Sequence, residues 1–218
     1  MGEGAAASDG TGAGGGSGAV AAPPAGGLKD RLFVFRGWGV IAFGIAILAW
    51  RWPLAPRLEY ALGALLPVLV GVAFRVWARC YFTRGSDTRR IQAHRLIVFG
   101  PYCRVRNPLY VGNIGVAVGL TLAFTDPLAA GVMLVALLVF YSGVIRSEEA
   151  VLERTWGESY LAFKRQVPRW LPRLTAVAAD ADAPEAQLAH AMRKEWKRLV
   201  GTFGGWGLAL YLAWRQVR

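Results

Sequence analysis

Two short stretches of this 218-residue chain carry the residue types best suited to chemistry. The first, residues 100–112, is Gly-Pro-Tyr-Cys-Arg-Val-Arg-Asn-Pro-Leu-Tyr-Val-Gly, and the second is the acidic pair Glu148-Glu149 at the end of an apolar segment. A turn containing Gly, Pro and Tyr brings backbone close to a flat ligand, because glycine permits conformations that a side chain would block. Carboxylates beside a membrane-length apolar segment are costly to bury, so they usually mark function.

The basic residues Arg104 and Arg106 stand with Asn107 directly before Pro108, which predicts the first turn of a helix. Helix N-termini and guanidinium groups both favour anions, so these residues are suited to a carboxylate or phosphate. An equally good alternative is that the arginines meet lipid headgroups. Tyr110 has the same two interpretations, as a ligand contact or as part of an interfacial aromatic belt.

Glu148 and Glu149 are neighbours, so on a helix their side chains point about 100° apart and one should face the bundle. The alternative is a pair of solvated surface acids. A buried carboxylate here is suited to holding an ammonium group or stabilising a sulfonium. It becomes a general base if burial raises its pKa.

The elements that position these residues are five apolar segments, each near the roughly 17 to 25 residues of a membrane-spanning helix. The chain is 55% hydrophobic with a mean hydropathy of +0.35. Only Thr125-Asp126-Pro127 separates the third segment from the fourth, which predicts an antiparallel hairpin. The predicted fold class is all-α, a helical integral membrane bundle of about five transmembrane helices, with segments at 32–50, 58–79, 108–124, 127–145 and 199–214.

The net charge of +11 does not indicate nucleic-acid binding, because the basic residues flank apolar runs. Residues 83–107 contain six Lys or Arg and residues 146–198 contain ten. The positive-inside tendency therefore predicts that both connections face the cytosol. A cofactor site on that face would receive a water-soluble cofactor from one side and a lipid-like substrate from the other. Cys80 and Cys103 have no metal-ligand spacing and are expected to be free thiols.

Composition divides the chain into four regions. Residues 1–27 form a Gly/Ala-rich tail that we expect to be disordered. Residues 28–93 hold two transmembrane helices and a basic loop, and residues 94–173 hold both candidate motifs, the hairpin and an amphipathic helix. That helix is predicted from the spacing of Leu152, Trp156, Tyr160 and Phe163, and Pro168 and Pro172 are expected to end it. Residues 174–218 form a linker and a C-terminal hydrophobic helix.

The two motifs resemble those of isoprenylcysteine carboxyl methyltransferases and related phospholipid methyltransferases. The first resembles His, five residues, Gly-x-Tyr, then Arg-His-Pro-x-Tyr-x-Gly; the second resembles Glu-Glu, an aromatic-Gly pair, Tyr and a Pro-bounded end. The match covers residues 94–172 and departs from the family at Asn107, where the family usually has His. The resemblance implies S-adenosylmethionine as cofactor, bound by His94, Gly100, Tyr102, Asn107, Pro108, Tyr110, Glu148 and Glu149, with catalytic roles for Arg106, Glu148 and Glu149.

The implied reaction is methyl transfer to a lipophilic acceptor, either a small lipid or a lipidated protein, in a membrane that composition suggests is bacterial. Expected partners are this acceptor and membrane lipids, with no metal and no nucleic acid. Two alternatives stay open. One is an NADPH-dependent membrane reductase of the sterol type, which has a related motif. The other is a non-catalytic membrane protein of the same fold, an interpretation that Asn107 favours because amides carry no charge.

Overall fold

The computed structural model of the protein describes residues 28–52, 54–81, 96–177 and 185–218. Within these ranges every regular element is helical. The helices are α1 (Leu28–Trp50), α2 (Leu58–Gly63), α3 (Leu65–Cys80), α4 (Pro108–Phe124), α5 (Pro127–Trp156), α6 (Glu158–Gln166) and α7 (Leu188–Val217), with a 3-10 turn, η1 (Gly100–Cys103), before α4. The expected tail 1–27, His94 and parts of the predicted basic loop and linker lie outside the described residues.

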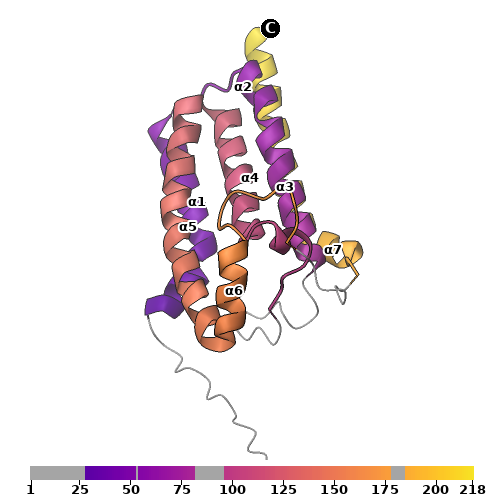
Figure 1. Ribbon diagram of the computed structural model, residues 1–218. Helices are drawn as coiled ribbons and strands as arrows, with labels where there is room; N and C mark the ends of the chain where they lie inside the picture. Colours follow the sequence, from indigo (N-terminus) through magenta and orange to yellow (C-terminus); the bar gives the residue numbers. More distant parts are fainter. Residues whose placement is uncertain (1–27, 53, 82–95, 178–184) are drawn as a thin grey trace, which may run out of the picture.

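The long helices run side by side as a bundle (Figure 1). Helix α4 lies between α5 and α3, while α1 packs on α5 and α7 packs on α3. The chain turns sharply between α4 and α5, so the end of α5 lies beside the beginning of α4. This confirms the predicted hairpin and places both candidate motifs at one end of the bundle, called here the basic end.

Helices α3 and α4 approach closely because glycines face each other across their interface. A Cβ atom on Gly71 would lie 2.7 Å from the carbonyl oxygen of Gly112, and one on Gly115 would lie 3.0 Å from the Cα of Gly71. Small residues of this kind allow the backbones of membrane helices to approach closely. The contact fixes α4, and with it the residues at its N-terminus.

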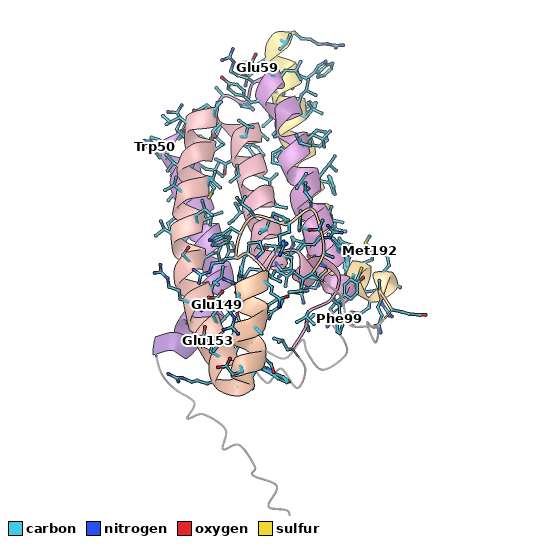
Figure 2. The ribbon with its side chains drawn as sticks, viewed as in Figure 1. Trp50, Glu59, Phe99, Glu149, Glu153 and Met192 are labelled. Atoms are coloured by element: carbon cyan, nitrogen blue, oxygen red, sulfur yellow. The ribbon has the colours of Figure 1, made fainter. Side chains whose placement is uncertain are left out.

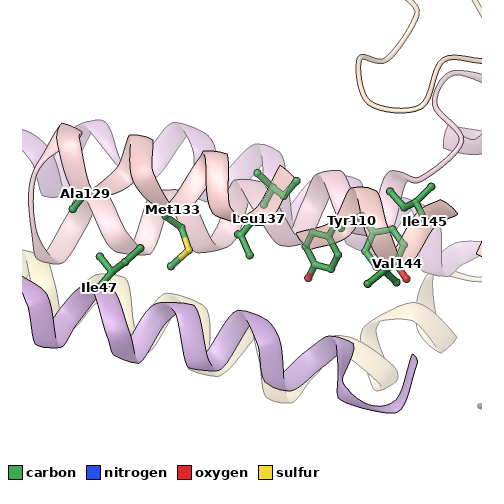
Figure 3. Close-up of a cluster of buried hydrophobic side chains, with 9 residues drawn as sticks. Ile47, Tyr110, Ala129, Met133, Leu137, Val144 and Ile145 are labelled. Carbon is green, nitrogen blue, oxygen red and sulfur yellow. The ribbon is translucent and has the colours of Figure 1, made fainter. Parts of the chain in front are cut away.

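The main hydrophobic core lies between α1, α4 and α5 (Figure 3). It contains Ile47 from α1, Tyr110 and Ile114 from α4, and a stripe along α5 that includes Met133, Leu137, Tyr141 and Ile145. Large apolar side chains on the outer faces are exposed, among them Leu66 on α3 at 70% and Val139 on α5 at 70%. An apolar outer face is what a helix in lipid presents.

Two described segments have the length and hydropathy to cross a membrane, Leu58–Cys80 and Pro127–Trp156. Trp38–Trp50 and Pro108–Phe124 are apolar but shorter. The first segment includes both α2 and α3, because Ala64 between them keeps helical dihedrals and its N–H donates to the carbonyl of Tyr60. Helices therefore form at all five predicted segments, and two of them pass this test of length and hydropathy.

The amphipathic stretch after Glu149 differs from the prediction of one continuous helix. Helix α5 extends to Trp156, and α6 begins at Glu158 after a break at Gly157, which has a φ of 50°. Left-handed backbone is accessible mainly to glycine, so Gly157 is where the helix ends and changes direction. The C-terminal helix also begins earlier than expected, at Leu188, and its first turns pack on α3.

Candidate functional site

The turn before α4 is a single 3-10 turn closed by local bonds. The carbonyl of Gly100 accepts a hydrogen bond from the Cys103 thiol at 2.7 Å, so that buried cysteine stabilises the turn. Gly100 has a φ of 59°, and a Cβ atom there would lie 2.1 Å from the ring of Tyr81. The glycine is therefore required by the backbone and by its neighbour.

Tyr102 lies in the same 3-10 turn, and its side chain is partly buried. Burial raises the pKa of Tyr102 above its ordinary value; Arg79 opposes this and Glu148 adds to it. The hydroxyl therefore stays protonated at neutral pH. Arg79 belongs to α3 and Glu148 to α5.

Arg104 and Arg106 connect the start of α4 to the segment that follows α6. Arg106 Nη1 donates to the carbonyl oxygens of Lys164 and Val167 at 2.6 and 3.0 Å, and its backbone N–H donates to Pro168. Arg104 Nη1 donates to the carbonyl of Leu174. Both guanidinium groups thus bond to backbone, and their predicted role in holding an anion stays a prediction.

Glu149 lies among several cations at the foot of α5. It is 4% exposed, and its carboxylate pairs with Arg169 at 2.5 Å and Arg106 at 3.2 Å, with Lys164 further away at 3.9 Å. These cations come from the start of α4, from α6 and from the segment after it. Glu149 therefore joins three parts of the chain, and removal of a partner from such a buried cluster is strongly destabilising.

Glu148 has a different environment, although it is the adjacent residue. Its carboxylate is partly buried and accepts a hydrogen bond from the hydroxyl of Tyr110 at 2.6 Å. The Tyr110 ring is 7% exposed and packs on Tyr141, with ring centroids 4.6 Å apart. Glu148 therefore presents a negative charge beside aromatic rings.

Asn107 and Pro108 begin α4 as predicted. Asn107 is the N-cap residue, but its side chain makes no capping bond; its Nδ2 lies 3.5 Å from the carbonyl oxygen of Arg169. Pro108 is buried at the first helical position. The Asn107 amide therefore faces the segment after α6. In the family that the motifs resemble, position 107 is usually His.

Several polar residues of this end were not singled out from the sequence: Arg75, Arg79, Asn113, Tyr141 and Arg169. The guanidinium of Arg75 donates to Asn113 Oδ1, and Asn113 Nδ2 donates to the Tyr141 hydroxyl at 3.0 Å. Arg75 and Asn113 had a usable signal, because each interrupts an apolar helix. Arg169 had none, since its pairing with Glu149 depends on tertiary structure. Among the described residues no group of three or more His, Cys, Asp or Glu is arranged to hold a metal ion.

Part of the chain is similar to known methyltransferases and to metal-resistance proteins. The sequence model for phospholipid methyltransferases matches residues 58–159, which contain the described α2 to α5 and the beginning of α6. The chain is 30% identical over 117 residues to the nickel-cobalt-cadmium resistance protein NccN of Alcaligenes xylosoxydans xylosoxydans, covering 54% of this chain and 52% of that protein. It is 28% identical over 136 residues to the human protein-S-isoprenylcysteine O-methyltransferase, covering 59% and 47%.

A third relative, the cobalt-zinc-cadmium resistance protein CzcN of Cupriavidus metallidurans, is 33% identical over 119 residues, covering 54% of this chain and 51% of that protein. The chain thus spans about half the length of these curated relatives. No solved structure matches it. The matched segment contains the first motif and the beginning of the second, including Glu148-Glu149, and residues 58–159 are thus similar to the phospholipid methyltransferase family.

Proposed function

We propose that this protein is an integral membrane methyltransferase that transfers a methyl group from S-adenosylmethionine to a lipophilic acceptor. One observation carries the proposal: Glu148 accepts a 2.6 Å hydrogen bond from Tyr110 at the end of the bundle where both family motifs meet. A partly buried carboxylate beside aromatic rings attracts a cationic group. S-adenosylmethionine carries two such groups, an ammonium and a sulfonium.

The other side chains of the basic end fit the remaining parts of this cofactor. The ring of Tyr102 offers a face for a flat base, and Arg79 and Arg106 supply positive charge for a carboxylate. The N-terminus of α4, beginning at Asn107 and Pro108, favours an anion for the same reason. The set therefore combines one negative group, several positive groups and aromatic surfaces, which complements a zwitterionic cofactor with an aromatic base.

The mechanism that follows is mainly one of positioning. When bound, the cofactor supplies a methyl group that is already electrophilic, so the protein must hold the acceptor in line and exclude water. Glu148 and Tyr110 orient the cationic part. Glu149 and Arg106 hold the segment after α6 against α4 and thereby keep the site closed on one side. An acceptor carboxylate needs no base, whereas an amine or thiol would lose its proton to Glu148.

The acceptor is proposed to be lipophilic because large apolar side chains are exposed on the outer faces of the helices. Some relatives are named protein-S-isoprenylcysteine O-methyltransferases. An isoprenylcysteine contains both a lipid chain and a carboxylate. A small lipid or a lipidated protein with an exposed carboxylate is the acceptor class that we propose. We also propose that all five apolar helices span the membrane, with the basic end in the cytosol, as the distribution of Lys and Arg favours.

Thermal melting of the detergent-solubilised protein tests the proposed cofactor. A ligand that binds only the folded state raises stability by about 2.7 kcal/mol at a hundred times its dissociation constant. We expect S-adenosylmethionine to raise the melting temperature and NADPH to leave it unchanged. A shift with NADPH alone would favour the reductase, and no shift with either ligand would favour a non-catalytic protein.

A further inference from the structure

A chain of buried and half-buried polar groups crosses the bundle from α7 to the candidate site. It begins at Glu195 on α7, a helix that lies wholly outside the segment matched to the family. It passes through Arg75 on α3 and Asn113 on α4 and reaches Tyr141 on α5. Polar groups inside an apolar bundle are costly, which raises the question of what this chain does.

Glu195 is the anchor of the chain. It is 1% exposed, and its Oε2 accepts from Arg75 Nε at 3.0 Å and Nη2 at 2.6 Å, while Oε1 accepts from Arg79 Nε at 3.0 Å. Burial alone would raise the pKa of Glu195, but attraction to Arg75 and hydrogen bonds from it, together with Arg198 and Arg79, outweigh burial and lower the pKa. The carboxylate is therefore ionised and fixes the orientation of the Arg75 guanidinium.

The Arg75 guanidinium, oriented by Glu195, contacts α4. Its side chain is 10% exposed and lies against Gly112, where a Cβ atom would be 2.5 Å from Arg75 Cγ. Glycine at that position leaves the room that Arg75 needs to reach Asn113. Asn113 Oδ1 accepts a hydrogen bond from the Arg75 guanidinium. Asn113 Nδ2 donates to the Tyr141 hydroxyl at 3.0 Å. The two ends of the Asn113 amide are thus assigned by their partners.

The last step joins the chain to the site. The Tyr141 ring is 1% exposed and packs on Tyr110 with centroids 4.6 Å apart and planes 38° apart. Tyr110 in turn donates its hydroxyl hydrogen to Glu148 at 2.6 Å. The rotation and tilt of Tyr110 therefore depend on where Tyr141 is held. Satisfied polar networks of this kind select one arrangement of a core.

We propose that Asn113 and Tyr141, held by the Arg75–Glu195 pair, are positioning residues that fix the Tyr110–Glu148 pair for binding the cationic part of the methyl donor. The C-terminal helix is then part of the site although it carries neither family motif. The inference about cofactor binding rests on the proposed function. The effect of Tyr141 on Glu148 does not rest on it.

The test uses Tyr141→Phe, which keeps the ring packed on Tyr110 and removes the hydroxyl that Asn113 holds. Glu195→Gln weakens the far end of the chain without changing side-chain size. Arg198→Ala is the matched control, because Arg198 also contacts Glu195, at 3.4 Å, but its side chain is 60% exposed. The full-length proteins in detergent are first compared by melting temperature to establish that each variant folds.

Two measurements follow. Labelling with a water-soluble carbodiimide and an amine, followed by peptide mass spectrometry, reports the reactivity of the Glu148 carboxylate without ligand. Titration with S-adenosylmethionine reports cofactor affinity. We expect Tyr141→Phe and Glu195→Gln each to increase Glu148 labelling at least about twofold and to weaken cofactor binding about three- to tenfold. Arg198→Ala should change neither quantity.

A double-mutant comparison separates positioning from general structural support. In a Glu148→Gln background, Tyr141→Phe should no longer affect cofactor affinity, because its influence passes through Glu148. Wild-type labelling of Glu148 in Tyr141→Phe and Glu195→Gln would overturn the inference. An equal loss of affinity in both backgrounds would also overturn it. Failure of the wild-type protein to bind S-adenosylmethionine would overturn the proposed function, while the labelling result would still decide whether the chain positions Glu148.

Discussion

The two ends of the bundle handle charge in opposite ways. At the basic end the central carboxylates, Glu149 and Glu195, are buried among arginines from distant parts of the chain. At the other end, Asp126 pairs with Arg51 and Glu59 pairs with Arg57 beside solvent, with side chains 21% to 61% exposed. Figure 2 shows Glu149 and Glu153 at the first end, and Trp50 and Glu59 at the second.

This difference indicates that the charged residues of the basic end serve a function in addition to folding. Exposed ion pairs add little to stability, whereas buried ones are costly to desolvate and are replaceable by apolar residues in many proteins. The basic end keeps its buried charges next to both family motifs. The opposite end contains the short turn at Thr125 and Asp126 that joins α4 to α5.

The largest difference that we predict between the ends is the side of the membrane that each one faces. Reporters inserted after Pro172 and between Pro56 and Arg57 should give opposite results, cytosolic for the first and external for the second, because Lys and Arg collect at the basic end. Reporter activity in intact cells measures this. Cytosolic signals from both sites would contradict the proposed topology.

The next largest effect concerns stability. Glu149→Gln leaves Arg106 and Arg169 without their shared carboxylate, so we expect a loss of about 3 kcal/mol and a fall in melting temperature of about 6 to 12 °C. Glu158→Gln is the control, because Glu158 pairs with Arg165 at 3.9 Å on the exposed surface. Similar melting temperatures for the two variants would mean that the Glu149 cluster is not a structural anchor.

The smallest effect is expected at the opposite end. Asp126 caps α5 by accepting from the Ala129 N–H at 3.0 Å, so Asp126→Ala should lower stability by about 1 kcal/mol, or about 2 to 4 °C. Asp126→Asn keeps a capping oxygen and should lose less. Equal losses from both variants would show that the pair with Arg51 outweighs the cap.

The stability difference between wild type and Asp126→Asn should also depend on pH. The hydrogen bond from Ala129, and then Arg51, lower the pKa of Asp126 below its ordinary value, although partial burial opposes this. The stabilising contribution is therefore present above the unfolded pKa of about 3.9 and is lost as the pH falls through the lower folded pKa. The gap in melting temperature between wild type and Asp126→Asn should close below about pH 4.

Local features of the fold were predictable from the sequence, because they depend on neighbouring residues. Pro108 begins α4, Thr125-Asp126-Pro127 makes the turn, and apolar runs form the helices. The break at Gly157 was missed because the apolar period continues across it, although a glycine there is itself a signal of a helix end.

The site was predictable only in outline. The motifs identified Tyr110 and Glu148 but not that they bond to each other, since this requires the register between α4 and α5. The sequence predicted an anionic ligand for Arg106, and that stays a prediction; its bonds to the carbonyls of Lys164 and Val167 could not be predicted, because they depend on tertiary structure. The pairing of Glu195 with Arg75 joins residues 120 positions apart and had no local pattern to reveal it.

The most direct test of the central claim, that Glu148 holds the methyl donor at the basic end, is calorimetric titration of S-adenosylmethionine into three detergent-solubilised proteins. These are the wild type, Glu148→Gln, and Asp126→Asn from the opposite end. Loss of a charged hydrogen bond costs about 1.5 to 3 kcal/mol, so Glu148→Gln should bind about ten- to a hundredfold more weakly at an unchanged melting temperature. Asp126→Asn should bind like the wild type. Equal affinity in all three proteins would contradict the claim and move the cofactor site away from Glu148.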